Sequence, residues 1–509
     1  MNERSDDATG RAEDPATTSP GSEAQAPSGA PVASGEPAAS GPPESTETAV
    51  AGRPAPTATA SASAPEAEPG GSNWPSTLRD IAQKGWLVTV LAIIVALVVG
   101  SILIIVASPR VQETSAYFFS RPWDTIYAAF DAVYGAYQAM FRGAIWDFRS
   151  DTLIGQLQPL SNTLVNSVPL ILAGLGLAVG FRAGLFNIGG QGQFILGSIA
   201  ATYVGFAWDL PFLVHLLLAM LGGAVAGGLW AAIPGVLKAR TGANEVIVTI
   251  MLNSIAGFLL AYILKSTVFG GERPSGQRSF SVAEAAEYPL LLGESFRLHA
   301  GVIVAVLAAA FVWWFLERST WGFELRAVGV NPAAARTAGV SVPKAIVVAM
   351  VVSGALCGLG GTAPVLGTEH YLSLGVAGTY GFDAITVALL GRSRPWGTLF
   401  AGLLFGALKA GGTLMSTTVV TPLAGAPAAM PIEFILVLQS VVVLFIAAPP
   451  LVRWIFHLPD ANRRRRKQTR RTRGQRLATT PNAAADDMVM VSNSSSPSSA
   501  ASDAQEGKA

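Results

Sequence analysis

Amide and carboxylate side chains lie in or beside strongly apolar stretches of this sequence. One group follows Arg182 in RAGLFNIGGQGQFILGSIAA (182–201), a second lies in GANEVIVTIMLNSIAGFL (242–259), and a carboxylate lies in GFDAITVALL (381–390). Polar groups within apolar segments cost free energy and are a common sign of a transport pathway. Seven such side chains are candidates for lining a path through a membrane: Asn187, Gln191, Gln193, Asn244, Glu245, Asn253 and Asp383.

Some of these charges have a simpler explanation. Glu245 and Glu433 each lie at the end of an apolar stretch, where a carboxylate can face the membrane interface and cap a helix. Both explanations stay open for these two residues.

The residue patterns of enzymes are missing from the sequence. The four histidines, His215, His299, His370 and His457, are scattered and form no HExxH motif. There is no GxSxG elbow and no GxxxxGK[ST] phosphate loop, and GGQG does not complete a dinucleotide fingerprint. A single cysteine, Cys357, allows no disulfide within the chain. We therefore expect no catalytic residues, no metal and no cofactor.

The composition predicts the elements that hold these polar groups. Half of the 509 residues are hydrophobic and only 13% are charged, whereas a soluble chain carries about 25% charged residues. Apolar runs of membrane-spanning length recur, which predicts an all-α polytopic membrane protein with about ten transmembrane helices. The expected spans are 86–108, a segment ending at 181, a segment starting near 182, 212–237, 246–264, 299–315, 345–366, 371–390, 396–410 and 432–449.

Glycines four residues apart occur in three of these segments, as Gly176/Gly180, Gly223/Gly227 and Gly354/Gly358. Small residues at this spacing allow two helix backbones to approach closely. We interpret these pairs as helix contacts rather than ligand sites.

Two tails flank the transmembrane domain, which we place at residues 74–452. Residues 1–73 are rich in Ala, Pro, Ser and Glu and are expected to be disordered. Residues 453–509 contain RRRRKQTRRTRGQR (463–476), then a low-complexity end. A basic run can bind nucleic acid, but directly after a span we favour anionic membrane lipid over nucleic acid. The distribution of Arg and Lys over the short loops predicts that both termini are cytoplasmic.

The loop at 318–344 is the most informative segment outside the spans. Asn331 suits a helix N-cap, Pro332 suits the first helical position, and Gly339 can end the helix. So short a helix needs a docking partner to be stable. We expect it to pack either on the protein's own inner face or in a cytoplasmic subunit.

Four segments together resemble permease subunits of ABC importers in the branched-chain amino acid and ribose permease superfamily. They are FRAGLFNIGGQGQFILG (181–197), GANEVIVTIMLNSIAGFL (242–259), LRAVGVNPAAARTAGV (325–340) and GFDAITVALLGRSRPWGTLFAGLLFGAL (381–408). The greatest similarity is to the nucleoside and simple-sugar branch, which works with basic-membrane-protein-type lipoprotein receptors. The resemblance spans the expected transmembrane domain and neither tail.

The resemblance implies a transport subunit in a bacterial cell membrane. Its implied partners are a cytoplasmic ATPase subunit, a second permease that is identical or paralogous, and an extracytoplasmic substrate-binding lipoprotein. It also implies an ATPase-coupling role for residues in the 318–344 loop: Arg326, Gly329, Asn331, Pro332, Ala335 and Gly339.

Gln191 departs from the family pattern, since many relatives carry an acidic residue there. If that acid binds a substrate hydroxyl, selectivity differs in this chain; if it only packs, nothing follows. We rank a nucleoside above a simple sugar as the substrate. A secondary transporter or channel without an ATPase, and a membrane scaffold that moves nothing, are the alternatives from other classes.

Overall fold

Apolar runs of the expected kind form helices in the computed structural model, which describes residues 85–271 and 277–417 and single positions between 436 and 455. Glu433, the N-terminal tail, the basic tail and most of the expected tenth span lie outside the described residues. Among the described residues, six helices are long and apolar enough to cross a membrane, and a bent helix pair makes up to seven.

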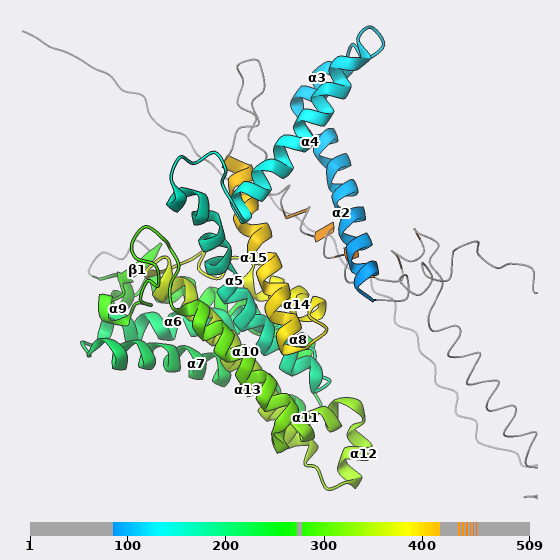
Figure 1. Cartoon of the computed structure of the whole chain (residues 1–509). Coiled ribbons are helices and arrows are strands. Elements are labelled where there is room, and N and C mark those ends of the chain that lie inside the picture. The colour runs from blue at the N-terminus through cyan, green and yellow to red at the C-terminus, as the bar shows by residue number, and fades with distance from the viewer. Residues whose placement is uncertain are drawn as a thin grey trace, which may run out of the picture. The chain divides into compact units, whose positions relative to one another are not determined.

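These six helices are the framework of the bundle, and the bent pair packs on α4 (Pro122–Ala144) (Figure 1). The six are α5 (Leu153–Arg182), α7 (Phe212–Thr241), α8 (Glu245–Leu264), α10 (Gly301–Arg318), α13 (Val342–Gly367) and α15 (Pro395–Thr417). The pair is α2 (Gly85–Ala107) with α3 (Pro109–Ser115), bent by 67°.

Shorter or more polar elements complete the described fold. They are α4 (Pro122–Ala144), α6 (Gly190–Ala207), α9 (Thr267–Gly270), β1 (Arg278–Ser281), the 3-10 helix η1 (Glu284–Ala286), α11 (Thr320–Val330), α12 (Pro332–Thr337), β2 (Tyr371–Ser373) and α14 (Tyr380–Leu390). The segment expected as an eighth span thus consists of a strand and a short apolar helix. The sequence interpretation did not include α4 or α11 as helices.

Helix α5 lies at the centre of the bundle, against α10, α13, α14 and α15. In its most apolar window 83% of the residues are buried, against 17% for α8. Large apolar side chains on α8, such as Phe258 at 76% exposure, instead point away from the protein. An apolar exposed surface on helices of this length is the surface that faces lipid.

Strands β1 and β2 form a small antiparallel pair in which Arg278 lies opposite Ser373. The pair joins the segment before α10 to the segment that follows α13. Backbone bonds from Val282 to His370 and from Tyr288 to Leu366 extend this connection. We call this end of the bundle the β1 end; α12 lies at the opposite end of the bundle (Figure 1).

Close contact between α7 and α13 depends on the predicted glycine pairs. A Cβ added to Gly358 would lie 2.9 Å from the Cα of Gly227, and one added to Gly354 would collide with the backbone of the same residue. The Gly354/Gly358 and Gly223/Gly227 spacing therefore marks a helix contact, as the sequence indicated. Gly176 on α5 faces the same helix, with its Cβ position 3.0 Å from Cys357 Sγ.

Replacing Gly358 by leucine is expected to lower the stability of the detergent-solubilised protein. The added side chain must push two backbones apart, at a cost of at least about 1–3 kcal/mol. Thermal unfolding followed by circular dichroism measures the effect. The matched control is Gly257→Leu on α8, where a Cβ meets nothing within 4 Å; equal melting temperatures for the two variants would contradict the packing argument.

Candidate functional site

Asn187 and Gln193 form a closed pair of amides. Asn187 Nδ2 donates to Gln193 Oε1 at 3.0 Å and to Ser353 Oγ at 3.0 Å, and Gln193 Nε2 donates back to Asn187 Oδ1 at 3.1 Å. The two side chains are 0% and 1% exposed. Because buried amides need partners and these have them, the pair holds the turn before α6 against α13.

Asn253 on α8 binds the same turn from the other side. Its Oδ1 accepts from the Gly192 amide at 2.8 Å, and its Nδ2 donates to the Ile188 carbonyl at 2.9 Å. Helix α6 begins at Gly190 and has no side-chain cap of its own. Asn253 therefore supplies from a neighbouring helix the bond that an N-cap normally supplies.

Gln191 holds the segment that leads into α14. Its Nε2 donates to the Gly378 carbonyl at 2.8 Å, and its Oε1 accepts from the Gly381 amide at 2.8 Å. A Cβ on Gly381 would collide with the Gln191 backbone. The two bonds bracket Tyr380, so Gln191 fixes the position of that tyrosine.

The other three candidates lie at the starts of α8 and α14. Asn244 caps α8 by accepting from the Val246 amide at 2.9 Å. Glu245 pairs with Lys238 at 2.5 Å and also accepts from the backbone of Phe186, in the turn before α6. Asp383 accepts from Thr379 Oγ1 at 2.7 Å and interacts electrostatically with Lys409. The fold thus brings Asn187, Gln191, Gln193 and Asn253 together around one turn, which Glu245 contacts from its edge.

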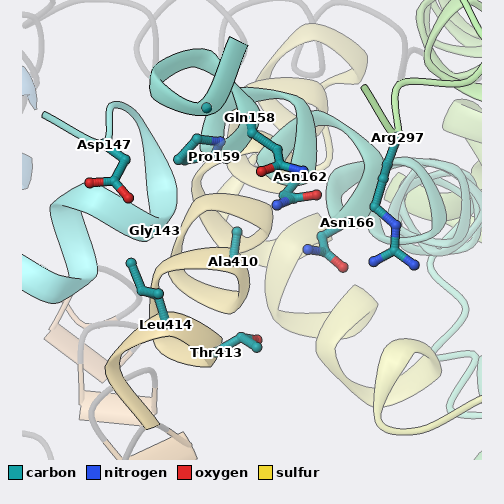
Figure 2. Close-up of a pocket in the computed structure, with 11 residues that line it drawn as sticks. Gly143, Asp147, Gln158, Pro159, Asn162, Asn166, Arg297, Ala410, Thr413 and Leu414 are labelled. Carbon is teal, nitrogen blue, oxygen red and sulfur yellow. The ribbon is translucent and has the colours of Figure 1, made fainter. Parts of the chain in front are cut away.

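A polar cavity opens at the β1 end of the bundle, in two adjoining compartments. The larger, of about 380 Å³, is lined by α4, α5, α15 and Arg297 (Figure 2). Three amides on α5 line it, Gln158, Asn162 and Asn166, one turn apart on one helix face. None of the three makes a side-chain hydrogen bond to the part of the chain that the structure describes.

The smaller compartment, of about 280 Å³, continues from Asn162, Asn166 and Arg297. Its other polar residues are His299, Thr368, Glu369 and Tyr380. The predicted path residues line neither compartment.

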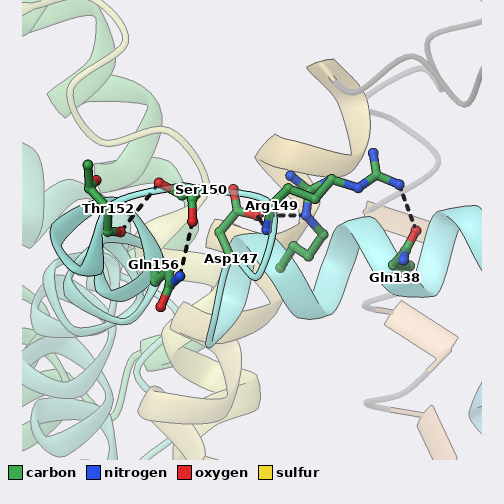
Figure 3. A network of polar contacts seen from close by, with 7 residues as sticks. Gln138, Asp147, Arg149, Ser150, Thr152 and Gln156 are labelled. Atoms are coloured by element: carbon green, nitrogen blue, oxygen red, sulfur yellow. Dashed lines mark hydrogen bonds and ion pairs between the residues drawn. The ribbon is translucent and has the colours of Figure 1, made fainter.

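A network in the turn between α4 and α5 shapes the larger compartment (Figure 3). Asp147 accepts from Arg142 Nε at 2.8 Å and from the Arg149 amide at 3.0 Å. The hydrogen bond from Arg142 holds the pKa of the Asp147 carboxyl below its ordinary value. Gln156 Nε2 donates to the Ser150 carbonyl at 3.0 Å, so the turn is tied to the first residues of α5.

Tyr380 separates the smaller compartment from the interior of the bundle. Its ring stacks on Phe194 with centroids 5.6 Å apart, and Lys409 Nζ lies 3.5 Å from the ring centroid. A lysine over an aromatic face is attracted by the ring's negative face. Two elements therefore hold this one ring in place, α6 through Gln191 and Phe194 and α15 through Lys409.

Helix α11 packs on the turn between α5 and α6 at the opposite end of α5. A Cβ on Gly329 would lie 2.9 Å from the Ala183 carbonyl carbon and 3.0 Å from the Gly184 nitrogen. Glu317 pairs with Arg326 at 2.8 Å and with Arg182 at 3.6 Å. A displacement of α11 would therefore also displace the start of the segment that contains Asn187 and Gln191.

The short helix expected after Asn331 is present as α12. Asn331 Oδ1 accepts from the amides of Ala333 and Ala334, and Pro332 is the first helical residue, which confirms the predicted start. Gly339 has a φ of +85° directly after the helix. Ala335 is buried, but the rest of α12 is exposed, and Val330 before it is 87% exposed.

Sequence reasoning missed the cavity residues on α5 and the lysine on α15. Gln158, Asn162 and Asn166 recur every four residues, which places them on one helix face, and Lys409 is a charge inside an apolar run. Gln158 lies in a segment expected to be a loop, whereas Asn162 and Asn166 lie inside the second expected span. Within the described residues, no group of three or more acidic, cysteine or histidine side chains could hold a metal ion.

Residues 160–447 match the family described as the permease component of branched-chain amino acid transport systems. A guanosine ABC transporter permease of Bacillus subtilis is 39% identical over 325 residues, covering 64% of this chain and 88% of the relative. A nucleoside ABC transporter permease of Lactococcus lactis is 32% identical over 342 residues, covering 65% and 91%.

A glucose ABC transporter permease of Haloferax volcanii is 37% identical over 305 residues, covering 58% of this chain and 77% of the relative. No solved structure is significantly similar to the chain. The expected family resemblance is therefore confirmed by the sequence comparisons alone. The chain belongs to the ABC transporter permease family of multi-pass plasma-membrane proteins, and is a transport subunit whose ATP is hydrolysed by a separate subunit.

Proposed function

We propose that this permease forms the path by which an ATP-driven importer carries nucleosides across the membrane. The observation that carries the proposal is a row of amides, Gln158, Asn162 and Asn166, that line a polar cavity at one end of an apolar bundle and make no side-chain hydrogen bond to the described residues. Amides left without partners in such a place are available to a solute. Each amide offers both a donor and an acceptor, which suits ribose hydroxyls and base edges.

The relatives favour a nucleoside over a sugar. The guanosine and nucleoside permeases align over 88% and 91% of their length, and the glucose permease over 77%. A simple sugar is the second candidate, because its hydroxyls suit the same amides and one relative carries glucose by name.

The proposed assembly has a cytoplasmic ATPase at α12, a second permease that is identical or paralogous, and a lipoprotein receptor over the cavity at the β1 end. The proposed topology has about ten spans with both termini cytoplasmic, a domain at 74–452 and tails at 1–73 and 453–509. The exposed surface of α12 and Val330 supports contact with a further subunit.

No chemistry on the substrate is proposed. ATP binding and hydrolysis in the partner would move α12 and α11, and Gly329 would pass that movement to the turn between α5 and α6. The amides of this turn extend the connection, since Asn187 binds α13, Asn253 comes from α8, and Gln191 holds Tyr380. Tyr380 would then open or close the floor of the cavity.

In this proposal the path residues predicted from sequence divide into three roles. Asn187, Gln191, Gln193 and Asn253 couple helices around the path, and Asp383 acts near Lys409 beneath the cavity. Asn244 and Glu245 stabilise the start of α8. In place of the predicted path residues, the cavity amides would contact the substrate.

Replacing both Asn162 and Asn166 by alanine is expected to lower nucleoside uptake about tenfold, because one or two lost hydrogen bonds amount to about 1.4 kcal/mol. The measurement is radiolabelled uptake by vesicles that contain the whole importer, normalised to permease content. Gln112→Ala on α3 removes an exposed amide outside the cavity and serves as the control. Unchanged uptake by the double variant would show that the cavity is not part of the transport path.

Vesicles that lack the ATPase partner test the class of transporter. Uptake without that partner, driven by a proton or sodium gradient, would identify a secondary transporter instead. We expect none.

Replacing Gly329 by valine is expected to uncouple ATP hydrolysis from uptake. The side chain cannot fit against the Arg182–Gly184 turn, so α11 must move away from α5 while the spans remain inserted. Pro332→Ala tests α12 in the same way. Permease content of the membrane, ATP hydrolysis and uptake are measured together, with Gly257→Val as control; normal uptake by both variants would contradict the coupling role.

Replacing Gln191 by glutamate is expected to reduce uptake at neutral pH. An ionised carboxylate cannot donate to the Gly378 carbonyl, so the segment holding Tyr380 loses a bond. At mildly acidic pH the protonated carboxyl regains a donor, and uptake should partly recover relative to wild type. A Gln191→Glu variant with wild-type uptake at every pH would show that this bond does not position Tyr380.

A further inference from the structure

The Nε2–H group of His299 has no hydrogen-bond acceptor among the described residues. The side chain is 0% exposed, and its Nδ1 accepts from the Gly301 amide at 3.1 Å. A neutral imidazole that accepts at Nδ1 carries its proton on Nε2. Nε2 has no hydrogen-bond partner among the described residues, which is costly for a buried group.

The ring of His299 is fixed in a narrow slot. It stacks on Tyr288 with centroids 5.4 Å apart, and burial raises the pKa of the Tyr288 hydroxyl to about 12. A Cβ on Gly367 would lie 2.7 Å from Nε2, and one on Gly301 would lie 2.7 Å from Nδ1. Both glycines leave the imidazole room, because a side chain at either position would collide with the ring.

His299 lines the smaller compartment together with Arg297 and Glu369. Arg297 is exposed and makes no ion pair with the described residues. Glu369 binds Ser373 Oγ through Oε2 at 3.0 Å, which leaves its other oxygen available. The compartment therefore combines two donors, the Arg297 guanidinium and His299 Nε2, with one acceptor, the Glu369 carboxylate.

We propose that the smaller compartment binds the edge of a 6-oxopurine base, with His299 and Arg297 donating to the base and Glu369 accepting from it. This inference rests on the proposed nucleoside path and adds the class of base.

The arrangement of donors selects among bases. A 6-oxopurine presents two adjacent acceptors, O6 and N7, which is the pair that an arginine fork recognises on guanine. Its ring N–H offers a donor to the carboxylate. A 6-aminopurine has an amino group in place of the oxo group. The donor groups of Arg297 and His299 would then face a donor on the base. Uracil has one carbonyl at the corresponding edge and no N7. The amides of α5, which suit ribose, do not discriminate among these bases.

The test compares inosine, adenosine and uridine uptake by vesicles containing the whole importer, with the same receptor throughout. We expect Arg297→Gln and Glu369→Gln each to lower inosine uptake about tenfold relative to adenosine, since one specific base contact amounts to roughly that factor. His299→Phe, which keeps a flat ring on Tyr288, should act in the same direction. Arg278→Gln, an exposed arginine beside Tyr371 and outside the cavity, is the control and should leave the ratio unchanged.

Equal losses for inosine and adenosine in the Arg297 and Glu369 variants would overturn the base assignment while leaving the nucleoside path intact. A wild-type importer that carries none of the three nucleosides would instead overturn the proposed function, and this inference with it. Because Arg297 is exposed and Glu369→Gln keeps the side-chain shape, the outcome does not depend on whether the His299 variant folds.

Discussion

An amide inside an apolar helix bundle must find a hydrogen-bond partner, because no water is there to supply one. This constraint divides the amides of the permease into two sets. Asn187, Gln193 and Asn253 satisfy each other or nearby backbone, and so hold α6, α8 and α13 in register. Asn162 and Asn166 have no side-chain partner in the described part of the chain, and they face a cavity. The need of every amide for a hydrogen-bond partner thus explains both the helix contacts around the turn before α6 and the polar cavity.

Helix α5 connects these two parts. At 1.5 Å per residue its 30 residues extend about 45 Å. Its first turns carry the cavity amides, and its last residue, Arg182, lies beside Glu317 and the α11 contact. A buried helix of this length transmits a displacement better than a loop does, since its neighbours leave it no other conformation. The cavity and the α12 end are therefore the two ends of one mechanical element.

The sequence predicted the parts of this structure that depend on local chemistry. Long apolar runs gave the framework helices, and Asn331 with Pro332 gave the start of α12, because a cap and a first-turn proline act within a few residues. The Gly354/Gly358 spacing likewise predicted close packing. The role of Gln191 could not be predicted, since its partners at Gly378 and Gly381 are almost two hundred residues away. The cavity required the same kind of distant information, because α5, the segment before α10 and the end of α13 form it jointly. The tenth span and both tails stay predictions.

The cavity walls have a consequence for how the cavity can change shape. The lining residues lie on α4, α5, α13, α14, α15 and the segment before α10, so no single element encloses the space. Asn162 and Asn166 lie one turn apart on one face of α5. A rotation of that helix about its axis would therefore carry both amides out of the cavity together.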